Sequence, residues 1–293
     1  MMRKLLVGVT LLASAESAVA QDLRPQVALP ELHWKSDGIL GAASLAGIVI
    51  GLELPVTRKD VPAQGLDPST IDWKIDRDIV GNPSTAADNA SDAFLLATVL
   101  APPMLIWVTQ HDVHGLDRFR RPLVLYGQSL LLAEACVQLL KPAVDRARPF
   151  TYLPASERPT EGSYDVTTRD AFVSMPSGHA ALGFAAASFA ATDNLLARPS
   201  AGTAEHVAVA GLSAMLAGFT GNLRVRADQH FPTDGLVGSL IGTASGVSVP
   251  MLHEYLLPGG GHVPHPSGHA WLLSAGGYVA GAALGAGLSS LLY

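Results

Sequence analysis

The sequence has few charged residues and only one cysteine. Charged side chains make up 15% of its 293 residues, whereas a typical soluble domain has roughly 25%. With Cys136 as its one cysteine, the chain can form neither an intrachain disulfide nor a multi-cysteine metal site. The net charge is −6 and no basic patch is present, so we expect no nucleic-acid partner.

The first twenty residues have the pattern of an export signal. A basic start at Met1 to Lys4 precedes a short apolar stretch, and Ala18-Val19-Ala20 is a cleavage site of the A-x-A type. Residues 1–20 are therefore predicted to be a signal peptide, with a retained N-terminal anchor as the alternative.

Long apolar segments dominate the rest of the chain, and most have the length that crosses a bilayer. They lie at about 38–54, 93–109, 122–140, 179–196, 206–221, 235–252 and 270–293. We predict an all-α multi-helix bundle, with about six membrane-spanning helices plus a C-terminal apolar helix. The buried interior of a soluble bundle is the alternative.

Four regions are expected along the chain. After the signal, residues 21–92 would hold one apolar helix and a polar loop over 55–92. Residues 93–252 would form the catalytic domain, and residues 253–293 a turn followed by the last apolar helix.

Two basic residues, Lys141 and Arg148, are seven positions apart, which is about two helical turns. On a helix they would project from the same face, and Pro149 would end that helix. Two fixed cations suit an anion with several oxygens, because Arg binds such a group through two parallel hydrogen bonds and Lys acts as a point charge.

The five residues PSGHA occur twice, first at Pro176 to Ala180. Pro, Ser and Gly are common where a helix begins. The free backbone amides of a helix N-terminus can hold an anion, so the Ser177 and Gly178 amides are candidate anion ligands. His179 would face the same ligand.

A third polar block follows at residues 224–234, where Arg224 and His230 precede Pro232. Proline is favoured at the first position of a helix, so His230 would lie on the loop and Asp234 in the first turns. The Asp234 carboxylate could then accept a hydrogen bond from one ring nitrogen of His230. The other nitrogen would be left free to attack.

The second PSGHA, at 266–270, lacks such neighbours. Residues 270–293 contain no Lys, Arg, Asp, Glu or His. We interpret this copy as a turn that leads into the last helix. A metal site at His262, His265 and His269 is the weaker alternative.

Together, Lys-x6-Arg-Pro at 141–149, Pro-Ser-Gly-His at 176–179 and Arg-x5-His-x3-Asp at 224–234 resemble the type 2 phosphatidic acid phosphatase superfamily. It includes lipid phosphatases, class A acid phosphatases and vanadium haloperoxidases. In the family the third block usually begins Ser-Arg, whereas Leu223 precedes Arg224 here. This departure puts the fine positioning of the site in doubt.

The resemblance implies a role for each matching residue. His230 would be the nucleophile that forms a phosphohistidine, Asp234 its orienting partner and His179 the general acid. The implied phosphate clamp consists of Lys141, Arg148, Ser177, Gly178 and Arg224. Three cations and helix amides can supply the charge that phosphoryl transfer needs, so no metal and no cofactor are expected.

The resemblance thus implies a metal-independent phosphatase in a bacterial cell membrane, with its site facing the periplasm. Its substrate would be a phospholipid or polyprenyl phosphate or diphosphate. A soluble exported acid phosphatase, a vanadate-dependent haloperoxidase and a lipid-binding protein with a vestigial site are the alternatives. A cleaved signal followed by three spans before Lys141 would instead place the site inside.

Two further expectations concern residues outside this set. Arg146 and Arg226 are predicted to pair with Asp145 and Asp228. The stretch from Phe150 to Met175 is either a cap over the substrate or a plain surface loop.

Overall fold

The computed structural model describes residues 32–57, 59–81, 83–110, 115–160, 163–257 and 266–292. Within these ranges there are eight α-helices and no strand, which confirms the all-α prediction. The helices are α2 (Trp34–Glu53), α3 (Lys74–Arg77), α4 (Thr85–Gln110), α5 (Gly115–Val144), α6 (Gly178–Ala197), α7 (Thr203–Arg226), α8 (Pro232–Tyr255) and α9 (Gly268–Leu292). Short 3₁₀ turns occupy Pro68–Thr70, Pro149–Tyr152 and Arg169–Phe172. The predicted signal at 1–20 lies outside the described residues.

Seven of these helices, all except α3, are long and apolar enough to cross a membrane. Each apolar segment expected from the sequence falls in one of them. Large apolar side chains such as Leu212, Leu240 and Leu272 are exposed on their outer faces, where lipid would cover them. The seven helices fit a multi-pass membrane protein.

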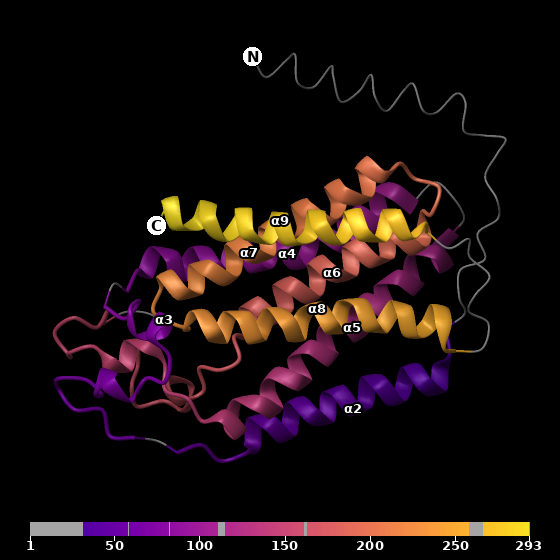
Figure 1. Cartoon of the computed structure of the whole chain (residues 1–293). Coiled ribbons are helices and arrows are strands. Elements are labelled where there is room, and N and C mark those ends of the chain that lie inside the picture. The colour runs from indigo at the N-terminus through magenta and orange to yellow at the C-terminus, as the bar shows by residue number, and fades with distance from the viewer. Residues whose placement is uncertain are drawn as a thin grey trace.

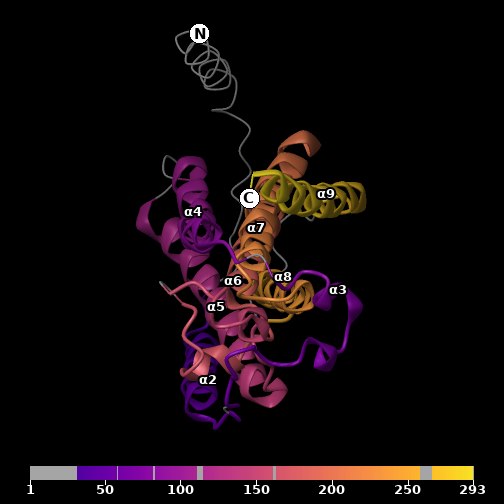
Figure 2. The same ribbon diagram turned by 90° about the vertical axis from the view of Figure 1, so that its left-hand side faces the viewer.

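The alanine-rich helix α6 lies inside the bundle and packs against α4, α5, α7 and α8 (Figures 1 and 2). Its small side chains allow α8 to approach closely. A Cβ on Gly242 of α8 would overlap the backbone oxygen of Ala181, and one on Gly246 would overlap that of Ala185. Such contacts between small residues are typical of helices packed in membranes.

The last helix, α9, packs along α7 through a similar row of small residues. Ser274, Gly281, Gly285 and Ser289 are buried at intervals of about one or two helical turns. A Cβ on Gly281 would overlap the backbone oxygen of Gly211 in α7. The first residues of α9 are the second PSGHA, and the Ser267 hydroxyl accepts a hydrogen bond from the Ala270 amide at 3.1 Å.

Substitution of Gly281 tests this packing. We expect Gly281→Leu to lower the free energy of unfolding by at least about 2 kcal/mol, since overpacking typically costs 1–3 kcal/mol. Gly287→Leu is the matched control, because a Cβ at Gly287 meets nothing within 4 Å. Thermal unfolding of both variants in detergent is the measurement. Equal melting temperatures for the two variants would contradict the observed contact.

All the sequence blocks singled out above, except the second PSGHA, lie at one end of the bundle. Helices α4, α6 and α8 begin there and α5 and α7 end there, together with the loops over 54–84 and 145–177 (left in Figure 1). The polar loop predicted for 55–92 is shorter than expected, because α4 already begins at Thr85. The second PSGHA opens α9 at the opposite end.

Candidate active site

The first block does not form one continuous helix, as the sequence suggested. Helix α5 ends at Val144, and Asp145 adopts a left-handed conformation with φ 51°, which Asp tolerates better than most residues. The Asp145 carboxylate accepts a hydrogen bond from the Thr57 amide at 3.0 Å. Lys141 therefore lies in the last turn of α5, while Arg148 lies in extended backbone before a 3₁₀ turn.

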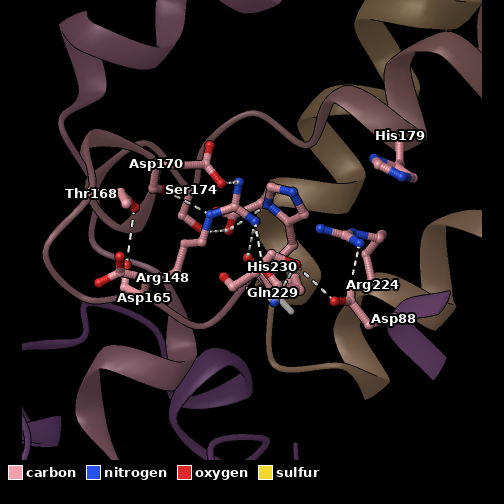
Figure 3. A network of polar contacts seen from close by, with 12 residues as sticks. Asp88, Arg148, Asp165, Thr168, Asp170, Ser174, His179, Arg224, Gln229 and His230 are labelled. Carbon is pink, nitrogen blue, oxygen red and sulfur yellow. Dashed lines mark hydrogen bonds and ion pairs between the residues drawn. The ribbon is translucent and has the colours of Figure 1, made fainter. Parts of the chain in front are cut away.

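Arg148 is held on two sides by neighbouring loops (Figure 3). Its Nε donates to the Asp170 carbonyl oxygen at 2.8 Å, and its Nη2 lies 2.7 Å from the Asp170 carboxylate. Its Nη1 donates to the side-chain oxygen of Gln229 at 2.8 Å. Burial by itself raises the pKa of Asp170, but Arg148 and Lys141 lower it overall. The Asp170 carboxylate therefore stays ionised beside these two cations.

Arg224, in the last turn of α7, is held by α4. Its Nη1 donates to the Asp88 carboxylate and, at 3.1 Å, to the Ser91 hydroxyl. Both Arg224 and Asp88 are buried. Asp88 and Ser91 lie in the region that the sequence assigned to the N-terminal segment, so this segment contributes to the site.

Helix α6 begins where the first PSGHA predicted. Ser177 is its N-cap, and the Ser177 hydroxyl accepts a hydrogen bond from the Ala180 amide at 3.4 Å. The Ser177 amide does not point to a free anion site as expected, because it donates to the Asp234 carbonyl oxygen at 3.0 Å. This bond joins the starts of α6 and α8 and leaves the Gly178 amide as the candidate donor from this helix N-terminus.

His179 follows in the first turn of α6 and faces α4. Its Nε2 lies 2.7 Å from the Asp92 carboxylate oxygen, and the same oxygen is 4.0 Å from Nη1 of Arg224. The sequence analysis missed Asp88 and Asp92. The signal that could have revealed them is a pair of carboxylates four residues apart at the start of an apolar helix, since ionisable residues in such helices often mark functional sites.

His230 is almost completely buried, with 2% of its surface exposed. Burial lowers its pKa well below 6.5, and the charges of Arg148, Arg224 and Lys141 lower it further. The imidazole is therefore neutral at pH 7, with a lone pair that can attack an electrophile. These charges also show that Lys141, Arg148 and Arg224 surround His230.

Asp234 lies near His230 as predicted, but Nδ1 of His230 is 3.7 Å from the carboxylate. That distance exceeds a hydrogen bond. The carboxylate instead accepts hydrogen bonds from the Ser174 hydroxyl at 2.5 Å and from the Phe231 amide at 2.8 Å. Among the described residues, Nδ1 of His230 has no hydrogen-bond partner.

Arg146 does not pair with Asp145, contrary to the sequence prediction. Its Nη1 is 2.5 Å from the Asp234 carboxylate, and its Nη2 is 2.8 Å from that of Asp76. The guanidinium also lies over the Phe231 ring, 4.0 Å from the centroid. The turn at Asp145 carries Arg146 away from its neighbour and toward the start of α8. Asp228, the partner predicted for Arg226, accepts a hydrogen bond from the Gly81 amide at 3.1 Å.

The stretch from Phe150 to Met175 is more than a plain surface loop. Phe150, Leu153, Tyr164 and Phe172 form a buried apolar cluster in its described part. This cluster fixes the loop that supplies Asp170 and Ser174 to the site. The described residues contain no group of three or more His, Cys, Asp or Glu side chains that could hold a metal ion. His262 and His265 lie outside them.

Comparison with protein families identifies the region that carries these residues. Residues 122–258 match the PAP2 superfamily, which confirms the resemblance drawn from the three sequence blocks. The match supports a phosphatase-type enzyme. It spans all three blocks but ends short of the second PSGHA, and it excludes Asp76, Asp88 and Asp92. Neither curated proteins nor solved structures gave a match.

Proposed function

We propose that this chain, whose residues 122–258 belong to the PAP2 superfamily, is a metal-independent phosphatase acting on a lipid phosphate or diphosphate. The observation that carries the proposal is a buried, neutral His230 among three cations, at one end of seven apolar helices. The helices would hold the lipid tail, and the loops would present the headgroup to the cations.

In the first step, Lys141, Arg148, Arg224 and the Gly178 amide bind the phosphoryl oxygens. Positive charge around the equatorial oxygens is the main requirement of phosphoryl transfer. Nε2 of His230 attacks phosphorus, and the bond from phosphorus to the leaving oxygen breaks. His179 gives that oxygen its proton, so the alcohol leaves and a phosphohistidine remains.

In the second step, water attacks the phosphohistidine and passes a proton to His179. The bond between phosphorus and Nε2 breaks, inorganic phosphate leaves and His230 returns to its neutral form. Asp234 would stabilise the His230 ring through Nδ1. Its contact at 3.7 Å would shorten when substrate binds, since catalytic hydrogen bonds often tighten only in the reacting complex.

The direct test is phosphate release from a short-chain phosphatidic acid by the detergent-purified protein in excess EDTA. We expect turnover that EDTA does not reduce, because three cations and a helix amide supply the charge. An enzyme inactivated by EDTA, and restored by a divalent metal, would rule out the metal-independent mechanism. Release of phosphate from water-soluble esters but not from the lipid would rule out the substrate class.

We also propose that the site faces the periplasm. Helices α2, α4 and α5 precede Lys141, so the site lies at the opposite end of the bundle from the start of α2. A periplasmic site then requires the start of α2 on the cytoplasmic side. We expect a cysteine placed at the exposed Asp165, in a Cys136→Ala background, to react with a membrane-impermeant maleimide in intact cells. Labelling only after the cells are lysed would place the site inside.

A further inference from the structure

A carboxylate from outside the three motifs lies beside the proposed proton donor. Asp92, on α4, is 69% exposed, yet its carboxylate contacts Nε2 of His179 at 2.7 Å. A group attached to the leaving oxygen must pass close to this carboxylate, because His179 is the residue that protonates that oxygen. Asp92 therefore belongs to the part of the site that meets the leaving group.

The negative charge of Asp92 is not matched by a cation of its own. Arg224 is the nearest cation, at 4.0 Å, but its Nη1 is already bound to the buried carboxylate of Asp88. With His179 neutral, the leaving-group side thus has two carboxylates and one guanidinium. An anionic leaving group would be repelled here, whereas an alcohol would not.

This inference rests on the proposed function and narrows its substrate. We propose that Asp92 makes the site selective for phosphate monoesters whose leaving group is an uncharged alcohol, and against diphosphates. In a diphosphate, the broken bond joins phosphorus to an oxygen that leaves as part of a second phosphate. That phosphate carries close to two negative charges at neutral pH, and it would lie against the Asp92 carboxylate.

The test compares two substrates with three proteins. kcat/KM is measured for a short-chain phosphatidic acid and for a short prenyl diphosphate, in the parent, in Asp92→Asn and in Asp165→Asn. Asparagine keeps the size of the side chain and a hydrogen-bonding oxygen for His179 but removes the charge. Asp165→Asn is the matched control, because Asp165 is an exposed carboxylate of the same end that bonds locally to Thr167.

We expect the parent to prefer the monoester by at least about tenfold, since unit charges about 4 Å apart interact appreciably even in water. In Asp92→Asn, kcat/KM for the diphosphate should rise by about tenfold in absolute value. The control should match the parent on both substrates. Added salt should raise the diphosphate activity of the parent more than that of Asp92→Asn, because salt screens exposed charges.

Three outcomes would overturn this selectivity. The parent could hydrolyse both substrates equally well. Asp92→Asn could lose monoester activity with no absolute gain on the diphosphate, which would make Asp92 a positioning residue for His179 alone. Asp165→Asn could show the same gain as Asp92→Asn. Failure of the parent to hydrolyse either substrate would instead refute the proposed function itself.

Discussion

Replacement of His230 with alanine should abolish phosphate release. We expect kcat to fall by at least about 10³-fold, since loss of a nucleophile can cost a hydrolase up to about 10⁶-fold. The reason is the chemical state of the ring. Burial and three surrounding cations keep the pKa of His230 well below 6.5, so nearly all molecules present a neutral imidazole at pH 7. No other described side chain combines that state with this position among the cations.

The matched control is His269→Ala, in the second PSGHA. His269 is exposed and lies in the first turn of α9, at the opposite end of the bundle from the proposed site. We expect its phosphate release to equal that of the parent, with a similar melting temperature in detergent for all three proteins. An inactive His269→Ala protein beside an active His230→Ala protein would show that the two PSGHA copies were assigned the wrong way round.

Loss of Arg146 should have the largest effect on stability. Its guanidinium lies between the carboxylates of Asp76 and Asp234, both of which have fully buried side chains. Removing one partner from a buried charged group typically costs 3–5 kcal/mol, because the remaining charge is left without compensation. We therefore expect Arg146→Met to lower the free energy of unfolding by about 3–5 kcal/mol and to reduce kcat, since Asp234 loses one of its fixed donors.

Chemical denaturation in detergent measures this change, with Arg226→Met as the matched control. Arg226 is an exposed arginine at the same end of the bundle, and exposed substitutions of this kind usually change stability by less than about 0.5 kcal/mol. The double variant Arg146→Met/Asp76→Asn should recover part of the loss, since it removes one uncompensated carboxylate. Arg146→Met as stable as Arg226→Met would contradict the buried ion-pair arrangement.

The features of the fold that depend on nearby residues could be predicted from the sequence. Ser177 and Pro232 mark the starts of α6 and α8 because helix N-termini have local residue preferences. The seven apolar segments predicted seven helices because a bilayer sets their length and composition. The order of the three motifs also brought Lys141, Arg148, Arg224, His179 and His230 to one end of the bundle.

The contacts that hold these residues in place could not be predicted in the same way. Arg224 binds Asp88 from 136 positions away, and Arg146 binds Asp76 from 70 positions away. No local spacing encodes such pairs, so Arg146 was assigned to its sequence neighbour. The helix end at Val144 was missed for a related reason. The Thr57 amide, which binds Asp145 in its left-handed conformation, comes from a distant loop.

These distant contacts give the N-terminal third of the chain a part in the proposed chemistry. Asp76, Asp88 and Asp92 lie before the family match, yet they contact Arg146, Arg224 and His179. The three motifs provide the reactive groups, and the preceding segment fixes their orientation and charge. Substrate selection by Asp92 would therefore be a property of this chain rather than of the shared motifs.

The measurement that tests the mechanism most directly is capture of the covalent intermediate. The detergent-purified protein would be mixed with short-chain phosphatidic acid labelled at phosphorus, quenched in alkali within milliseconds and digested for peptide mapping. We predict a label that is stable in alkali and lost in acid, on the peptide containing His230, and absent from His230→Ala. A label on another residue, or turnover by His230→Ala at the parent rate, would contradict the assignment of His230 as the nucleophile.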